Sequence, residues 1–129
     1  MLEIRFSKPK ELEVSGTVDE LQSVRNQILA LVENDIAQIA FECDGSINSM
    51  PYDSVLSKFI VRKSQLPTKV SLENSNELCV EGLPHCLEAF ASFLDFEANS
   101  KSGRHSHYEY YEGNQWISPD SMPLVISVK

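Results

Sequence analysis

The sequence predicts an α+β domain in which two helices pack on one face of a single antiparallel or mixed sheet of about six to eight strands. Two segments carry apolar residues at helical spacing, and several short segments are rich in β-branched and aromatic residues. A third observation is that the order strand, turn, strand, glycine, helix occurs twice. The length of 129 residues fits one domain over residues 1–129, and 42% hydrophobic residues can form its core without disulfides.

The repeated order has an offset of 66 residues. Residues 11–16 align with residues 77–82 and Leu21 aligns with Leu87, which gives five identities over eleven positions. Just upstream, residues 4–6 align with residues 70–72, and a turn-like connector follows in both places. Each half therefore reads as a ββα unit. A true duplication and a chance use of the same pattern are both open.

The two helices have identifiable starts. The hydroxyl of Thr17 can accept a hydrogen bond from the backbone N–H of Glu20, whose carboxylate can reach back to the backbone N–H of Thr17. This helix should end near Asn34, and the second should begin at Pro84, because proline loses no hydrogen bond in a first helical turn. The apolar stripes consist of Val18, Leu21, Val24, Ile28, Leu31 and Val32 in the first helix and Leu83, Leu87, Phe90, Phe93 and Leu94 in the second.

The other segments are expected to be strands and loops. A turn-rich connection with Gly45 and Pro51 separates two of the strands, and the polar, glycine-ended residues 97–103 should form a mobile loop. Besides the strands of the repeat, the pattern predicts strands at 36–41, 55–62, 107–111 and 124–128.

Composition narrows the function classes. A net charge of −8 argues against binding to nucleic-acid phosphates and favours a basic partner. The N-terminal residues contain no apolar run long enough for a signal peptide or a membrane span, so we expect a cytoplasmic protein without membrane contact. Cys43, Cys79 and Cys86 are odd in number and form no CxxC pair, which predicts reduced, mostly buried thiols.

Charge is segregated along the chain. Residues 11–53 contain nine acidic residues and one basic residue, and residues 70–100 contain six acidic residues and no Lys or Arg. Such segregation can produce an acidic surface that attracts a cationic partner, or merely a well-solvated surface. The positive charges cluster instead at Lys58, Arg62, Lys63 and Lys69.

The densest group of candidate functional residues is His105, His107 and Glu109. On a strand these three side chains point to the same face. Two imidazoles and a carboxylate can bind zinc and leave a site for water, which would make the protein a metal-dependent hydrolase. Three ligands within five residues of one strand make a tight site, however, and no general base is evident. A polar strand face or an interface patch is the alternative.

Other catalytic signatures are absent, including GxGxxG, Walker, GxSxG and HExxH motifs. His85 and Cys86 are adjacent, but neighbouring helical residues point about 100° apart, so they cannot readily act as base and nucleophile. Tyr108 should face the core with Tyr110. Tyr111 and Trp116 can join the histidines and Glu109 in an aromatic and polar interface patch. Trp116 capping the core is the alternative.

Residues 105–111, with the sequence HSHYEYY, and residues 118–126, with the sequence SPDSMPLVI, carry a family resemblance. A histidine-rich strand, an aromatic pair and a turn leading into Pro-Leu-Val-Ile resemble the immunity protein 32 family of bacterial polymorphic-toxin systems. The ββ-glycine-helix opening is weaker support for the same resemblance, which covers nearly the whole chain in order.

This resemblance implies a small cytoplasmic protein that binds and neutralises a cognate toxin domain, often a basic nuclease, without catalysis, cofactor or metal. It supplies no motif with an assigned inhibitory role. The hydrolase described above and a domain that self-associates through an unpaired sheet edge are the alternatives, and the sequence leaves monomer and homodimer open. The candidate toxin-binding residues are His105, His107, Glu109, Tyr111 and Trp116, with Asp44 and Asp53 from the long connection.

Overall fold

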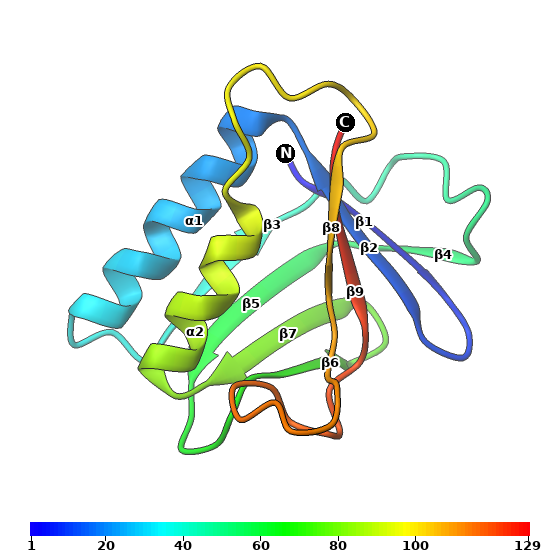
Figure 1. The fold of residues 1–129 in the computed structure, drawn as a ribbon. Coiled ribbons are helices and arrows are strands. Elements are labelled where there is room, and N and C mark those ends of the chain that lie inside the picture. The colour runs from blue at the N-terminus through cyan, green and yellow to red at the C-terminus, as the bar shows by residue number, and fades with distance from the viewer.

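Nine strands form two sheets, and two helices lie side by side over one face of the smaller sheet (Figure 1). The computed structural model describes residues 1–129. The first half of the chain contains β1 (Glu3–Ser7), β2 (Glu11–Gly16), α1 (Val18–Glu33), β3 (Gln38–Glu42), β4 (Ser54–Leu56) and β5 (Lys58–Lys63). The second half contains β6 (Lys69–Glu73), β7 (Glu77–Gly82), α2 (Pro84–Ala91), the 3-10 turn η1 (Ser92–Leu94), β8 (His105–Tyr108) and β9 (Leu124–Val128).

The larger sheet has the strand order β4-β1-β2-β9-β8, and the smaller sheet has the order β3-β5-β7-β6. The predicted α+β class and the two helices are confirmed, but the predicted single sheet of six to eight strands is wrong. The difference comes from two parallel pairings between distant segments, β2 with β9 and β5 with β7. Alternating apolar residues identify a strand and its buried face, but they do not identify the sheet to which it belongs.

The repeat seen in the sequence extends through the whole fold. Each half forms an antiparallel hairpin, a helix and then two strands that pair antiparallel with each other. Val14 and Val80, 66 residues apart, hold equivalent central positions in the two sheets. Their cross-strand neighbours are buried aliphatic residues in both halves, namely Ile4 and Ile126 for Val14 and Val70 and Val61 for Val80.

The two halves exchange strands. The hairpin of the first half, β1 and β2, shares the larger sheet with β8 and β9 of the second half. The hairpin of the second half, β6 and β7, shares the smaller sheet with β3 and β5 of the first half. The repeated unit is therefore ββαββ rather than ββα, and β4 has no counterpart. Neither sheet can form from one half alone.

The two repeated glycines serve the same close approach. A Cβ atom on Gly16 would lie 2.7 Å from Cδ2 of Leu2, and one on Gly82 would lie 2.9 Å from Cα of Thr68. Leu2 and Thr68 are themselves 66 residues apart. At Gly82 the contact is with backbone, so a larger residue would require a shift of the chain, whereas at Gly16 the contact is with the end of the Leu2 side chain, which can move aside. The glycine at the end of the second strand is therefore a packing requirement in the second half and a close fit in the first.

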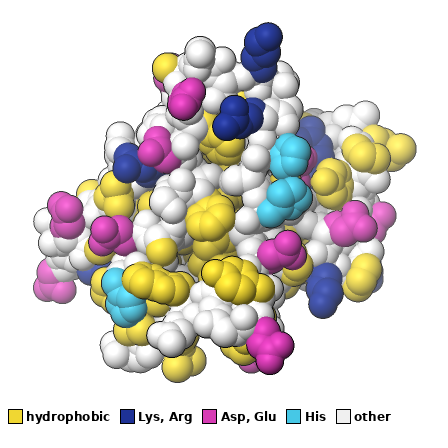
Figure 2. Space-filling model, in the orientation of Figure 1, with side chains coloured by type: hydrophobic (Ala, Val, Ile, Leu, Met, Phe, Trp, Pro, Cys, Tyr) yellow, Lys and Arg dark blue, Asp and Glu magenta, His cyan; other side chains and the backbone are white.

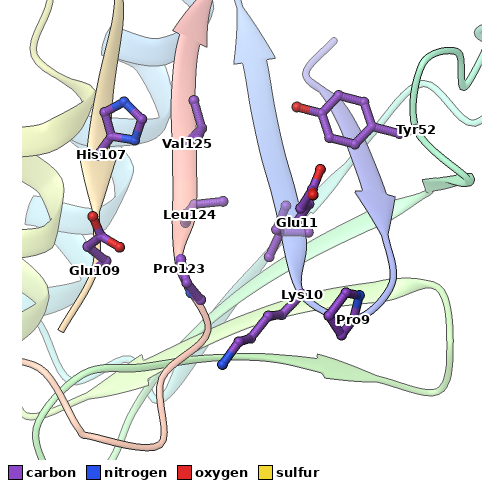
Figure 3. A pocket seen from close by; sticks show the side chains of 10 residues that line it. Pro9, Lys10, Glu11, Tyr52, His107, Glu109, Pro123, Leu124 and Val125 are labelled. Carbon is purple, nitrogen blue, oxygen red and sulfur yellow. The ribbon is translucent and has the colours of Figure 1, made fainter.

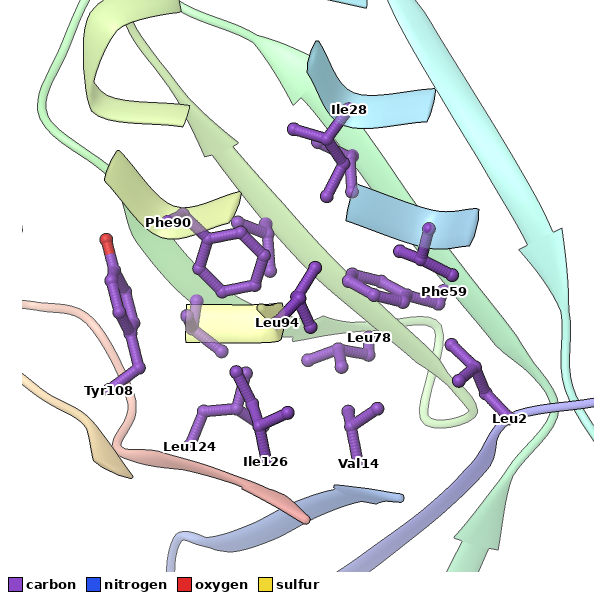
Figure 4. Packing of buried hydrophobic residues seen from close by; sticks show 14 of the residues in the cluster. Leu2, Val14, Ile28, Phe59, Leu78, Phe90, Leu94, Tyr108, Leu124 and Ile126 are labelled. Atoms are coloured by element: carbon purple, nitrogen blue, oxygen red, sulfur yellow. The ribbon is translucent and has the colours of Figure 1, made fainter. Parts of the chain in front are cut away.

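The core lies between the two helices and the inner faces of both sheets (Figure 4). Its 24 buried residues form one continuous cluster. The ring of Tyr108 packs edge-on against Phe90 and Phe93, with ring centroids 4.9 Å apart in both pairs. Contributions come from every layer, with Ile28 from α1, Phe90 from α2, Leu94 from η1, Phe59 and Leu78 from the smaller sheet, and Val14, Leu124 and Ile126 from the larger one.

Several element boundaries differ from the prediction. The expected strand 55–62 is interrupted at Ser57, because β4 pairs with β1 while β5 pairs with β3 and β7. The expected strand 36–41 begins two residues later, at Gln38. The final strand, the second-helix start at Pro84 and the loop at 97–103 are confirmed.

All three cysteines are free and buried, as predicted. Burial raises the pKa of Cys43 and of Cys79 to about 12. Because the thiolate is the reactive form, these groups are inert at neutral pH and serve as small apolar core residues. No helix has the length and apolar character required to cross a membrane.

The capping box predicted at the start of α1 is present. The Thr17 hydroxyl accepts a hydrogen bond from the Glu20 N–H at 3.1 Å, and the Glu20 carboxylate accepts one from the Thr17 N–H at 2.9 Å. Replacing Thr17 with Ala should lower the free energy of unfolding by about 1 kcal/mol, because one N–H of the first turn loses its partner. Urea unfolding followed by circular dichroism measures this loss. Thr17→Ser should retain most of the stability. Equal urea midpoints for the unaltered protein, Thr17→Ala and Thr17→Ser would contradict this account of the helix start.

Candidate functional site

Strand β8 presents two histidines on the outer face of the larger sheet. His105 and His107 both point away from the core, as alternation predicts, and lie opposite Ser127 and Val125 of β9. Their rings meet edge-to-face with centroids 5.0 Å apart. Because β8 is the last strand of its sheet, these histidines stand at an edge.

The strand ends at Tyr108, so the predicted strand through Tyr111 is wrong. The chain then leaves the larger sheet and crosses to β6 of the smaller one. There the Thr68 N–H donates to the Trp116 carbonyl at 3.0 Å, and the Ser118 N–H donates to the Thr68 carbonyl at 2.8 Å. This crossing places residues 109–118 beyond the end of β8, where several of them line a hollow with His107 and Tyr108. Tyr108 is buried as predicted, but Tyr110 is only partly buried.

A hollow of about 460 Å³ lies on one side of the end of β8. We call it the aromatic hollow; its walls include Phe93, Tyr108, Tyr111 and Trp116. Trp116 and Tyr111 are 48% and 67% exposed, and neither belongs to the core cluster or to the residues packed against it. The Asn114 side chain holds the Trp116 backbone, accepting its N–H at 2.7 Å. On this face of the molecule two adjacent histidines lie beside a hydrophobic area (Figure 2).

A second hollow, of about 420 Å³, lies on the other side of the end of β8 (Figure 3). We call it the β9 groove, because Pro123, Leu124 and Val125 form its floor. One wall consists of His107 and Glu109, and the opposite wall comes from the β1–β2 turn, Glu11 and Tyr52. His107 and Glu109 line both hollows and form the ridge between them. We call these two residues the β8 ridge.

Most of the predicted site residues lie together. His105, His107, Glu109, Tyr111 and Trp116 all belong to β8 or the loop that follows it, around the ridge and the aromatic hollow. They form a single exposed surface that combines aromatic rings, imidazoles and a carboxylate.

The two predicted aspartates lie apart from this surface and from each other. Asp53 accepts the Lys8 N–H at 3.0 Å and adjoins Tyr52, so it lies at the edge of the β9 groove. The Asp44 N–H donates to the Leu2 carbonyl at 3.0 Å, at the opposite end of β1. Hydrogen bonds from the Ser46 hydroxyl and backbone lower the pKa of Asp44. That carboxylate is therefore used in hydrogen bonds within its own loop, and it does not belong to the ridge surface.

No three histidine, cysteine, aspartate or glutamate side chains converge as a metal ion requires. Glu109 follows the end of β8, so His105, His107 and Glu109 do not form the three-ligand group on which the hydrolase hypothesis depends. His85 packs edge-on against Trp116, with ring centroids 5.2 Å apart, whereas Cys86 is buried. These two residues therefore do not form a base and nucleophile pair.

Three of the four predicted basic residues lie on β5, an inner strand of the smaller sheet, and Lys69 lies on its edge strand β6. Arg62 forms ion pairs with Glu73 and with Glu81, the latter at 3.0 Å. The Lys63 ammonium donates to the Asn34 carbonyl at 2.6 Å at the end of α1. Two of the four basic residues are therefore engaged within the fold, and the cluster is not a free cationic patch.

Sequence reasoning missed the groove wall formed by Glu11 and Tyr52, and it missed Phe93 in the aromatic hollow. Glu11 and Tyr52 approach β8 only because β2 and β9 pair in parallel across more than a hundred residues of sequence. No local pattern signals that pairing. Phe93 was predicted as part of the second helical stripe, and it does pack on the core while one side of it lines the hollow.

Comparison with known proteins finds no match to a protein-family model, to a curated protein or to a solved structure. The resemblance to the immunity protein 32 family therefore stays a prediction.

Proposed function

We propose that this protein is an immunity protein that binds a cognate bacterial toxin domain directly and neutralises it. The binding surface comprises the β8 ridge, His105, and the aromatic hollow with Tyr111 and Trp116. The observation that supports this proposal most strongly is the pair of exposed aromatic side chains beside a hollow. Tryptophan and tyrosine are enriched among the residues that dominate binding energy at protein interfaces.

The shape of the surface supports a protein partner. The two hollows have volumes of about 460 and 420 Å³, and the two residues of the β8 ridge separate them. A partner that inserts one side chain into each hollow would straddle the ridge and exclude water from it. Exclusion of water around a central anchor is typical of strong protein interfaces.

Charge supports a basic partner. The chain has a net charge of −8, and the ridge surface contains Glu109 with no lysine or arginine among the residues of the aromatic hollow. An acidic protein attracts a basic toxin over several ångströms and accelerates their encounter. Many nucleases present basic surfaces to their substrates, so a basic nuclease toxin fits this charge.

The proposal predicts protection in cells. If a toxin-like domain is encoded beside this protein, that domain should stop growth when expressed alone, and coexpression of this protein should restore growth. Coexpression of an unrelated acidic protein of similar size is the control for nonspecific charge effects. Growth arrest that persists at full expression of the protein would refute the proposed function.

A further inference from the structure

The carboxylates of the β9 groove differ from the others on the same sheet face. Glu3 forms ion pairs with Arg5 and Lys129, both at 3.1 Å, and Glu13 accepts a hydrogen bond from Ser127 at 3.2 Å. Glu11 and Glu109, on opposite walls of the groove, have no ion-pair or hydrogen-bond partner for their side chains. The groove therefore has a carboxylate without an ion-pair partner on each side.

The rest of the groove suits a long side chain with a flat cationic end. Pro123 and Val125 give the floor an apolar surface on which a methylene chain can lie. The ring of Tyr52 stands on the wall next to Glu11, where a cation can pack on its face. Burial and the nearby carboxylates of Glu13 and Glu11 raise the pKa of Tyr52, which is consistent with a negative potential in the groove.

Lys10 is the one Lys or Arg side chain that lines the groove. It belongs to the β1–β2 turn, and its side chain extends toward the end of β9 below Pro123, away from the carboxylate of Glu11 (Figure 3). It forms no ion pair with Glu11 or Glu109. Lys10 therefore neutralises neither carboxylate through an ion pair, and the groove has two carboxylates and one ammonium among its lining residues.

We propose that the β9 groove binds an arginine side chain of the partner protein, with the stem on Val125 and the guanidinium between Glu11 and Glu109. Arginine fits better than lysine because its planar guanidinium can bind a carboxylate through two hydrogen bonds and stack on an aromatic ring. This inference rests on the proposed function for the identity of the partner, but the chemistry of the groove can be tested without the toxin.

The test is a titration of the ¹⁵N-labelled protein with N-acetyl-arginine amide, followed by amide chemical shifts. Saturable shifts are expected at Glu11, Val125 and Glu109, with a dissociation constant in the millimolar range for so small a probe. N-acetyl-citrulline amide, which has nearly the same shape without the charge, should bind at least about tenfold more weakly. Absence of groove shifts with the arginine probe, or equal shifts with both probes, would overturn the inference.

Variants separate this inference from the proposed function. The double variant Glu11→Gln/Glu109→Gln should lose the arginine-specific shifts, and Glu33→Gln, a matched change at an exposed site at the end of α1, should retain them. If the toxin domain binds the double variant as tightly as it binds the unaltered protein, the proposed arginine binding is refuted and the proposed immunity function is not. If the groove binds the arginine probe but the protein fails to restore growth, only the proposed immunity function is refuted.

Discussion

A chain that is cut between Gln65 and Leu66 should stay folded, while each isolated half should be unfolded. Both residues are exposed in the connection between β5 and β6. Each half supplies strands to both sheets, so separation removes β9 from β2 and β7 from β5. The buried surface of Val14, Val61 and Val80 would then face water. Losing both central pairings costs far more than the marginal stability of a domain this size.

This prediction is measured by inserting a protease site at that position and cleaving the folded protein. The nicked protein should elute as one species, keep its circular dichroism spectrum, and unfold at a urea concentration that depends on protein concentration. Fragments separated in urea and then dialysed alone should show no cooperative unfolding. A stable, cooperative fold of either fragment alone would contradict the exchanged-strand architecture.

Replacing Trp116 with Ala should weaken toxin binding by about 2 kcal/mol or more, which corresponds to a loss of affinity of about 30-fold. The indole is the larger of the two exposed rings beside the aromatic hollow, and it packs on His85 with nearly half of its surface free. Its backbone hydrogen bonds to Asn114 and Thr68 do not need the indole, so the loop should keep its path.

The matched control is Leu66→Ala, because Leu66 is also a large exposed hydrophobic residue, at 69% exposure, but lies outside both hollows. Calorimetric titration of each variant with the toxin domain gives the change in affinity, and urea unfolding checks that both variants are folded. If Trp116→Ala and Leu66→Ala bind equally well, the aromatic hollow is not the anchor of the interface.

The local elements of the fold could be predicted from the sequence, because their causes lie within a few residues. The Thr17–Glu20 capping box and Pro84 begin the two helices where the sequence places them. The offset of 66 residues also indicates two related units from the sequence alone. Both halves have a glycine in a close contact at the end of the second strand, and this part of the repeat is visible in the sequence.

The arrangement of the sheets could not be predicted, because it depends on which distant strands pair. Ser57 looks like the middle of one strand, yet it separates a strand of the larger sheet from a strand of the smaller sheet. For the same reason, the candidate site could be predicted from the sequence only in part. His107 and Trp116, which are close in sequence, do line the same hollow, whereas Asp44 lies apart from it and the position of Glu11 could not be seen in the sequence.

The measurement that tests the central claim most directly is a titration of the purified protein into the purified toxin domain, with residual toxin activity assayed at each point. The account predicts a one-to-one complex, tighter than micromolar, with activity falling to zero at equivalence. Separate elution of the two proteins, with toxin activity unchanged at excess, would contradict direct neutralisation by this fold.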